Sequence, residues 1–572
     1  MRYLQLAHNE WDPAAGVSRT KVLYSFGRED RLDRAAVRRL VGALSRLLTA
    51  GEALSAGPDP GLVFTESRPL GGAFVLDGLW RRLGIDTAIR RLLAPRRIDE
   101  VLVERVLFAL VANRALAPSS KLAATRWVGH EVAIEGLAAV DDDTCYRAMD
   151  ALLEVADALA RQVYDQVADL LNLEVDLLFF DTTSTYFELD EADQPLPRDD
   201  RGWVTAPEEP GDASAQTAPE VHQVGDGAGK PAGFRSYGKS KDHREDLPQV
   251  VVGMAVTRDG IPVRVWCWPG NTADSALIRQ VKADLRDWNL ARVVWVADRG
   301  FTSKANRRYL QRAGGHYILG EKLRSGSVEA EAALSRPGRY HHVAENLQVK
   351  EVRLPADVGA DDRFVVCFNP EAAQRDQHVR DRLLAHLGEL IAGSDNLSAT
   401  KRAELRGAIG TRPGLKRFLR TTASGLLRID TKAIAAEARL DGKYLLRSSD
   451  PKLSATDIAQ GYRQLAQVER GWRDMKQILD LRPVYHRRED RIRAHVLLCW
   501  LALLLIRITE TTTTRTWPAL REELQHLHVG TFTGPAGTFA QRTELTTGQR
   551  QILATLKLPD PPRILTATPA TG

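Results

Sequence analysis

Three acidic residues that lie far apart in the chain have the chemistry needed to cut and join phosphodiester bonds. Asp181 follows the apolar run 175–180 in LLFFDTTSTYF, Asp298 follows the apolar run 293–297, and Glu469 lies in YRQLAQVERGWRDMKQILDL. Carboxylates without softer ligands suit a hard cation such as Mg²⁺ or Mn²⁺. Two such ions stabilise the entering and leaving oxygens of an in-line phosphoryl displacement. The residue types therefore predict a two-metal site for phosphoryl transfer.

Each acid also has an ordinary structural explanation. An Asp at the end of a strand often begins a turn, which accounts for Asp181 or Asp298 taken singly. Glu469 has Lys476 and Arg473 within reach of a solvated helix face, although about 10 Å along the helix axis separates Glu469 from Lys476. A carboxylate beside an apolar stripe is costly unless it is paired or bound to metal. The three acids together favour the shared site.

Hydrophobic periodicity predicts the elements that would bring the acids together. The expected order is a strand at 175–180, hairpin strands at 250–256 and 261–268, a helix at 273–288, a strand at 293–297, a helix from 303 and a strand at 316–319. This is the connectivity of a ribonuclease H-like core, in which neighbouring strands carry Asp181 and Asp298 to one edge of the sheet. One helix over 462–481 would carry Glu469 in a row with Tyr462 and Lys476.

The expected fold is therefore α/β: a ribonuclease H-like catalytic core, with a mixed sheet flanked by helices, to which two further domains are attached. Residues 1–172 are predicted to form a mainly helical DNA-binding domain with a helix-turn-helix-like pair around Pro118. The core is expected at 173–320 and 448–510, interrupted by a mixed α/β insertion at 321–447. The segment 511–572 is a C-terminal tail and a candidate oligomerisation segment.

Composition places further bounds on the function. The 572 residues carry 79 basic and 74 acidic side chains, so a DNA-binding surface must come from local clusters of charge. Within 188–234, eleven acidic residues stand against three basic ones, which predicts a flexible acidic loop. The longest apolar run, 496–506, is shorter than the roughly 20 residues that span a bilayer, so we expect a buried helix and no membrane partner. The four cysteines are widely separated, which excludes a zinc ribbon and fits a cytoplasmic protein.

The motifs around the acids resemble those of bacterial DDE transposases in the insertion-sequence-four-like group, whose signature is Y-x(2)-R-x(3)-E-x(6)-K. Tyr462, Glu469 and Lys476 match the Tyr, Glu and Lys of this signature, whereas Leu465 stands at its Arg position. The resemblance extends to the segments DTTSTYF, SKDHR and ADRGF. It implies that Asp181 and Asp298 join Glu469 in holding two Mg²⁺ ions, and that Tyr462 and Lys476 contact DNA near the transferred end.

Several arginines are candidate phosphate ligands. Arg463 and Arg473 are positioned to replace the missing signature arginine, and Arg299 directly follows one of the acids. The arginine-rich segment 482–493 adds Arg487 and Arg488, because arginine suits bidentate phosphate contacts. Internal pairing of this segment with its own acids is the competing explanation. For Asp242 and His243, a turn before the next strand and a role at the site are both open.

The resemblance implies an enzyme that binds the terminal inverted repeats of an insertion sequence and catalyses metal-dependent DNA cleavage and strand transfer. It also implies a homodimer in a paired-end complex on double-stranded DNA, associated with the bacterial nucleoid in the cytoplasm. One alternative is a catalytically silent DNA-binding protein descended from a transposase. Another is a phosphohydrolase with an aspartyl nucleophile. Thr183 argues against it, because this residue occupies the position of the second Asp in the D-x-D-x-T motif.

Overall fold

The computed structural model describes residues 2–13, 16–45, 62–171, 177–199, 201–205, 229–286, 288, 293–324, 327–355, 362–482, 484–535 and 537–569. The chain divides into two compact units, each of which is described by itself. Unit 1 contains Met1–Ser67, Gly530–Gln541 and Ile564–Gly572, and unit 2 contains Arg68–Val529 and Arg542–Arg563.

Unit 1 is built mainly from strands. Strands β1 (Tyr3–Asp12) and β2 (Val17–Arg28) form an antiparallel hairpin, followed by α1 (Arg34–Ser45), whose first turn is capped by the Asp33 carboxylate. A four-stranded sheet has the order β19-β18-β17-β3. Its strands are β3 (Val63–Pro69), β17 (His528–Gly534), β18 (Gly537–Arg542) and β19 (Ile564–Pro569). Strands therefore accompany the helices that the sequence predicts for 1–172, and three more form within the expected tail at 511–572.

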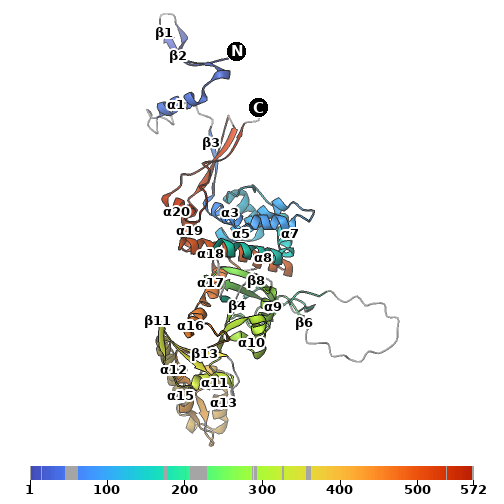
Figure 1. Ribbon diagram of the computed structural model, residues 1–572, viewed down its shortest axis with the longest axis vertical. Helices are drawn as coiled ribbons and strands as arrows, with labels where there is room; N and C mark the ends of the chain where they lie inside the picture. Colours follow the sequence, from blue (N-terminus) through green and yellow to red (C-terminus); the bar gives the residue numbers. More distant parts are fainter. Residues whose placement is uncertain are drawn as a thin grey trace, which may run out of the picture. The chain divides into compact units, whose positions relative to one another are not determined.

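Unit 2 contains a large mixed sheet with helices on both sides (Figure 1). The order of its nine strands is β11-β12-β13-β16-β10-β9-β4-β7-β8, in which β4, β9 and β10 run parallel and the other neighbours antiparallel. The strands are β4 (Leu177–Tyr186), β7 (Gln249–Thr257), β8 (Pro262–Pro269), β9 (Val294–Ala297), β10 (His316–Glu321), β11 (His341–Ala344), β12 (Leu347–Arg353), β13 (Arg363–Phe368) and β16 (Lys443–Ser448). All of the strands expected for the core are present, in the expected order.

The helices of unit 2 precede, cover and follow this sheet. They are α3 (Gly71–Arg82), α4 (Ile85–Leu93), α5 (Glu100–Leu116), α6 (Lys121–Arg126), α7 (Asp142–Glu154), α8 (Ala156–Leu171), α9 (Asp274–Asp284), α10 (Lys304–Gln311), α11 (Val328–Ser335), α12 (Pro370–Ile391), α13 (Ala399–Gly410), α14 (Pro413–Lys416), α15 (Thr431–Ala438), α16 (Ala455–Arg463), α17 (Ala466–Gln477), α18 (Glu489–Thr513), α19 (Trp517–Leu524) and α20 (Thr547–Thr555). Shorter elements are β5 (Leu196–Arg198), β6 (Gly229–Ala232), β14 (Leu419–Thr421), β15 (Leu427–Ile429) and the one-turn helix η3 (Arg299–Phe301).

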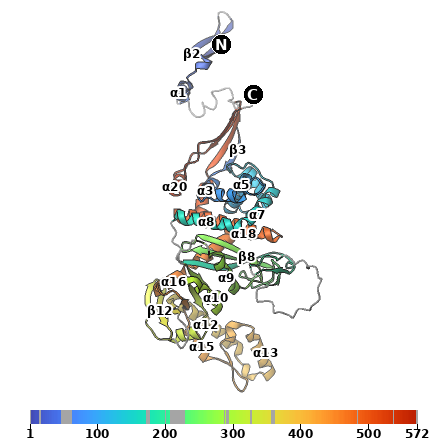
Figure 2. The same cartoon turned by 45° about the vertical axis from the view of Figure 1, so that its right-hand side comes forward.

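The two faces of the sheet carry different helices (Figure 2). Asp181 on β4 is paired with Met254 on β7, and the methyl group of Met254 lies under Gly471 of α17. The side chain of Thr182 points to the opposite face, where its hydroxyl donates to Asp274 of α9 at 2.7 Å. Helix α17 therefore covers the face from which Asp181 projects, and α9 covers the other.

Helix α18 forms part of the core of unit 2. Among the described residues it is the one helix long and apolar enough to cross a membrane, but 94% of its apolar window is buried inside the protein. It packs against β8, α5 and α7. The expected buried helix around 496–506 is thereby confirmed.

The expected insertion at 321–447 contains both strands and helices, and four of its strands are joined to the main sheet. Strands β11, β12, β13 and β16 continue the main sheet, since β16 pairs with β10 on one side and with β13 on the other. Helices α12 to α15 add a small cluster of their own around Leu387, Ile409, Leu415 and Phe418. The insertion thus widens the core sheet and carries a helical layer beyond it.

Two other predicted segments need correction or restriction. The helix expected over 462–481 is divided at Gln464 and Leu465, so Tyr462 belongs to α16 while Glu469 and Lys476 belong to α17. The expected acidic loop at 188–234 holds the antiparallel pair β5–β6 among its described residues. Its part at 206–228 lies outside the residues that the structure describes.

Candidate active site

Two of the three acids lie on neighbouring parallel strands. Strand β4 continues through Asp181 to Tyr186 instead of ending at Asp181, because the threonines that follow favour extended backbone. Asp298 directly follows β9. Since Phe180 is paired with Ala297 in the parallel register, Asp181 and Asp298 occupy adjacent positions, as the sequence predicts.

The third acid reaches the same cavity from the covering helix. Glu469 is exposed on α17, and it lines a cavity of about 370 Å³ together with Asp181 and Asp298. Tyr462, Arg463, Leu465 and Asn369 are among the other lining residues. Within the described ranges, no three His, Cys, Asp or Glu side chains are close enough to hold one metal ion between them. The acids therefore share a cavity without converging on a single point.

A lysine that the sequence analysis did not single out neutralises the first acid. The Lys241 ammonium lies 3.7 Å from the Asp181 carboxylate and 3.4 Å from that of Asp274, and it donates to the Thr182 carbonyl at 2.7 Å. Desolvation raises the pKa of Asp181 above its ordinary value, and Lys241 opposes that rise. The sequence analysis did not single out Asp274 either. An acidic residue in the first turn of a helix is common, so its position at the start of α9 did not indicate a site.

Tyr462 contacts the second acid directly. Its hydroxyl donates to Asp298 Oδ1 at 3.2 Å, and its ring stacks on Tyr444 with 5.9 Å between the centroids. Burial raises the pKa of Tyr462, so the hydroxyl keeps its proton and remains a donor to the carboxylate. The hydroxyl lies against Gly320 of β10, where an added Cβ would overlap it. The signature tyrosine thus orients Asp298 in this structure.

If the three acids cut DNA, as the resemblance in sequence implies, Gly320→Ala should reduce that cleavage about tenfold to a hundredfold, because the new methyl group pushes the Tyr462 hydroxyl away from Asp298. Cleavage of a labelled DNA end and the thermal unfolding midpoint should be measured together. Gly388→Ala is the control, since a Cβ at Gly388 meets open space. Unchanged cleavage by Gly320→Ala would show that the contact between Tyr462 and Asp298 is unimportant.

The signature lysine is not paired with Glu469. The Lys476 ammonium donates to both carboxylate oxygens of Asp242, at 2.9 and 3.2 Å, and Arg482 lies 2.8 Å from the same carboxylate. Asp242 is therefore the partner of both Lys476 and Arg482, and its role at the site stays a prediction.

The predicted phosphate ligands lie in different surroundings. Arg299 is exposed in η3 and lines a neighbouring cavity of about 410 Å³, which shares Asp298 and Tyr462 with the cavity of the acids. Arg463 lines the cavity of the acids, and Arg473 is exposed on α17. Arg487 and Arg488 are exposed before α18, where Arg488 forms an ion pair with Asp490. Their DNA contacts stay predictions.

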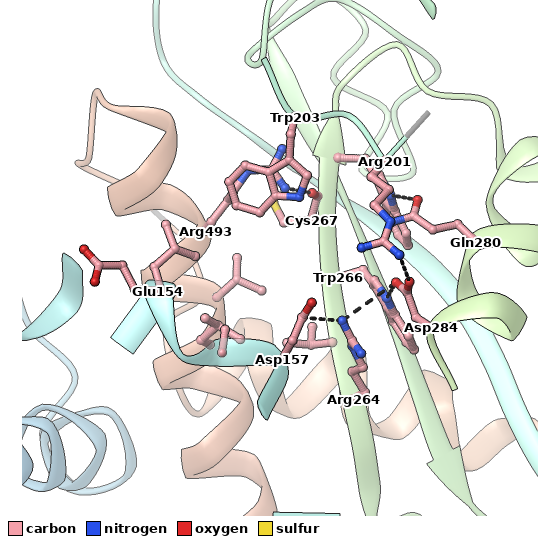
Figure 3. Close-up of a pocket in the computed structure, with 16 residues that line it drawn as sticks. Glu154, Asp157, Arg201, Trp203, Arg264, Trp266, Cys267, Gln280, Asp284 and Arg493 are labelled. Atoms are coloured by element: carbon pink, nitrogen blue, oxygen red, sulfur yellow. Dashed lines mark hydrogen bonds and ion pairs between the residues drawn. The ribbon is translucent and has the colours of Figure 1, made fainter. Parts of the chain in front are cut away.

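Other arginines of the segment 482–493 are used internally. Arg493 donates to the carbonyls of Cys267 and Gly202, and its guanidinium lies 3.9 Å from the centre of the Trp203 ring. It borders a cavity of about 250 Å³ beside β8, in which Arg264 lies between Asp157 and Asp284 (Figure 3). Arg493 also pairs with Glu489 at 2.8 Å, and Arg488 pairs with Asp490, so the competing explanation of internal pairing holds for both arginines.

Buried ion pairs fix the helix that carries Glu469. Arg507 of α18 is 3% exposed and lies 2.5 Å from Asp474 of α17 and 2.7 Å from Glu510. Arg470 of α17 also reaches Glu510, at 2.9 Å. Because the loss of one partner would leave a buried charge unpaired, these contacts set the position of α17 on α18.

Comparison with known proteins identifies a class consistent with these acids. The model of the transposase DDE domain family matches residues 212–505, and the chain therefore belongs to that family. It is a transposase-family protein; Asp298, Tyr462, Glu469 and Lys476 lie inside the matched segment, and Asp181 precedes it. No curated protein matches the chain. A cryo-EM structure of a piggyBac transposase synaptic complex with hairpin DNA aligns at 11% identity and a TM-score of 0.33, covering 79% of this chain and 78% of that one.

Proposed function

We propose that this protein is a metal-dependent DNA transposase of the insertion-sequence-four-like group, with Asp181, Asp298 and Glu469 as its catalytic acids. The observation that carries the proposal is the parallel register of β4 and β9, which sets Asp181 beside Asp298 in a cavity that Glu469 also lines. Membership in the transposase DDE domain family supports the same assignment.

We further propose that the catalytic core is ribonuclease H-like. The strand order β8-β7-β4-β9-β10 supports this assignment, with an antiparallel triplet followed by two parallel neighbours. In such a core the first acid lies on the central strand and the second follows its parallel neighbour, as Asp181 and Asp298 do here. The core supplies a rigid base for two of the three acids.

The side chains that line the cavity fit a divalent metal ion in their chemistry. Their carboxylate oxygens are the ligands that Mg²⁺ and Mn²⁺ prefer. Desolvation raises the pKa of Asp181 even with Lys241 beside it, so a bound cation would further stabilise its carboxylate. Asp181, Asp298 and Glu469 would hold the two ions. When bound, such ions activate the attacking oxygen and stabilise the leaving oxygen of a phosphodiester.

The other residues of the cavity would bind and orient the DNA. Tyr462 holds Asp298 through its hydrogen bond. Arg463, the last residue of α16, lines the same cavity as Glu469. Arg463 and Arg473 would supply the cationic contact that Leu465 cannot make. Arg299 would bind a second phosphate from the neighbouring cavity. These contacts would place one phosphodiester at the acids.

The reaction would exchange one phosphodiester for another. A water oxygen bonds to the phosphorus at the end of the element, the bond to the 3′ oxygen breaks, and a 3′-hydroxyl is released. That hydroxyl then bonds to a phosphorus of target DNA and displaces another 3′ oxygen. The N-terminal region would recognise the terminal inverted repeats, with a homodimer bringing two ends together on the bacterial nucleoid.

Incubation of the full-length protein with labelled duplexes that carry the two ends of its own element tests this function. With Mg²⁺ or Mn²⁺ we expect a nick that leaves a 3′-hydroxyl, followed by joining to a target plasmid. Chelation with EDTA should stop both steps. Binding of the ends without any cleavage in either metal would favour the catalytically silent alternative.

A further inference from the structure

The carboxylate of Asp242 is held by two cations that lie far from it in the sequence. Lys476 of α17 contacts both oxygens of Asp242, and Arg482 contacts one of them at 2.8 Å. Asp242 and Lys476 are only 13% and 12% exposed, so the pair is largely shielded from water. Lysine and arginine hold phosphate oxygens through the same kind of charge-assisted contact.

Two further cations lie close to Asp242 in the sequence, and each is paired with another acid. Arg482 and Arg244 lie over the Tyr186 ring, at 5.3 and 5.1 Å from its centre. Lys241, the neighbour of Asp242 in sequence, pairs with Asp181. Burial lowers the pKa of Lys476 below its ordinary value, so its ammonium depends on an anion beside it. An anion between Lys476 and Arg482 therefore stabilises both charges.

Asp242 reaches this position from a turn with an unusual backbone. His243 has a φ of 58°, in the left-handed region that residues other than glycine rarely adopt. A conformation of this kind persists only where the surrounding structure holds it. The amide of Asp242 also donates to the Ser240 hydroxyl at 3.2 Å. The turn lies between β6 and β7, outside the strands of the main sheet.

We propose that Asp242 takes the place of a DNA phosphate between Lys476 and Arg482 in the DNA-free protein, and that bound DNA displaces it. The proposal rests on the proposed DNA transposase function and adds a self-occupied phosphate subsite to it. Exchange of a carboxylate for a phosphate keeps both cations paired throughout. Because Asp242 must be displaced, it weakens DNA binding. Lys241 lies one residue away and pairs with Asp181, so the same turn connects the subsite to the first acid.

The test is the affinity of full-length Asp242→Asn for a short fluorescent duplex, measured by anisotropy at several salt concentrations. We expect the dissociation constant to fall about fivefold to tenfold, because the amide keeps the shape but no longer competes for the cations. The plot of log K against log salt concentration should steepen by about one phosphate contact. Duplexes of unrelated sequence should gain equally, since phosphate contacts carry no sequence information.

Three further single substitutions and one double variant make the result specific. Asp246→Asn removes the same charge four residues away, from an exposed carboxylate that pairs with Arg244, and should leave the affinity within twofold. Lys476→Gln should weaken binding, and combined with Asp242→Asn it should abolish the gain. If Asp242→Asn lowers the unfolding midpoint, Arg482→Gln gives a second measurement, and it should weaken binding as Lys476→Gln does.

The outcomes separate this proposal from the proposed function. If the wild-type protein binds DNA and Asp242→Asn binds it equally well or more weakly, the subsite proposal alone is overturned. An equal gain from Asp246→Asn would reduce the effect to general electrostatics and overturn it as well. Absence of DNA binding by the wild-type protein and by every variant would overturn both proposals.

Discussion

Replacement of Asp298 by Asn should reduce cleavage of a DNA end by a factor on the order of 1,000, with DNA binding unchanged within about twofold. The amide has the shape of the carboxylate and can still accept the Tyr462 hydrogen bond, so the local structure should persist. What is lost is the negative charge beside Asp181, which a bound cation requires. Single-turnover cleavage of a labelled duplex in Mg²⁺ and in Mn²⁺ measures the effect.

A matched control separates the loss of this carboxylate from the loss of any surface charge. Asp259 is exposed in the turn between β7 and β8, and Asp259→Asn makes the identical change away from the cavity. It should cleave at the wild-type rate. Wild-type cleavage by Asp298→Asn would remove that residue from the site and would leave the adjacency of Asp181 and Asp298 without a catalytic meaning.

Replacement of Lys121 by Met should stabilise the protein by about 4 kcal/mol near pH 6. Lys121 is 4% exposed at the start of α6, and desolvation with the nearby Arg114 lowers its pKa from 10.5 to about 7. Between those pH values the unfolded chain holds a proton that the folded chain has released. The free energy of unfolding of the wild-type protein therefore rises with pH across that window, and the penalty is complete below pH 7.

The thermal unfolding midpoint of wild type and Lys121→Met, followed from pH 6 to pH 9.5, checks this prediction. The variant should melt several degrees higher at pH 6. At pH 9.5 the difference in the free energy of unfolding should fall to about 1 kcal/mol, and the difference in midpoint should shrink with it. Lys401→Met, at an exposed position of α13, should change the midpoint little at any pH. A difference that does not depend on pH would show that Lys121 is not held deprotonated by burial.

Local patterns were sufficient to predict most elements of the core. The alternating and apolar runs predicted β7, β8, β9 and β10, and the helix expected from 303 is confirmed by the Ser303 side-chain cap of α10. These signals lie within a few residues of the element they define. The adjacency of Asp181 and Asp298 followed from the strand order alone.

The errors arose where long-range contacts decide the outcome. The residues between α16 and α17, Gln464 and Leu465, are neither glycine nor proline, so the sequence did not indicate that the helix is divided there. The Lys241 contacts with Asp181 and Asp274 join residues that are far apart in sequence, so spacing could not reveal them. The pairing of Lys476 with Asp242 was not predicted for the same reason, since 234 positions separate the two residues. The strands of the insertion look alike whether they form a new sheet or extend an old one.

The central place of β16 in the sheet limits how the chain tolerates deletion. Because β16 hydrogen-bonds to β10 and to β13, shortening the gene between these strands cannot excise a self-contained module. Removal of β13 would uncover a row of backbone amides and carbonyls, and such an open margin recruits other chains. A miniaturised version of this protein would have to keep β16 and supply a new neighbour that shields it from self-association.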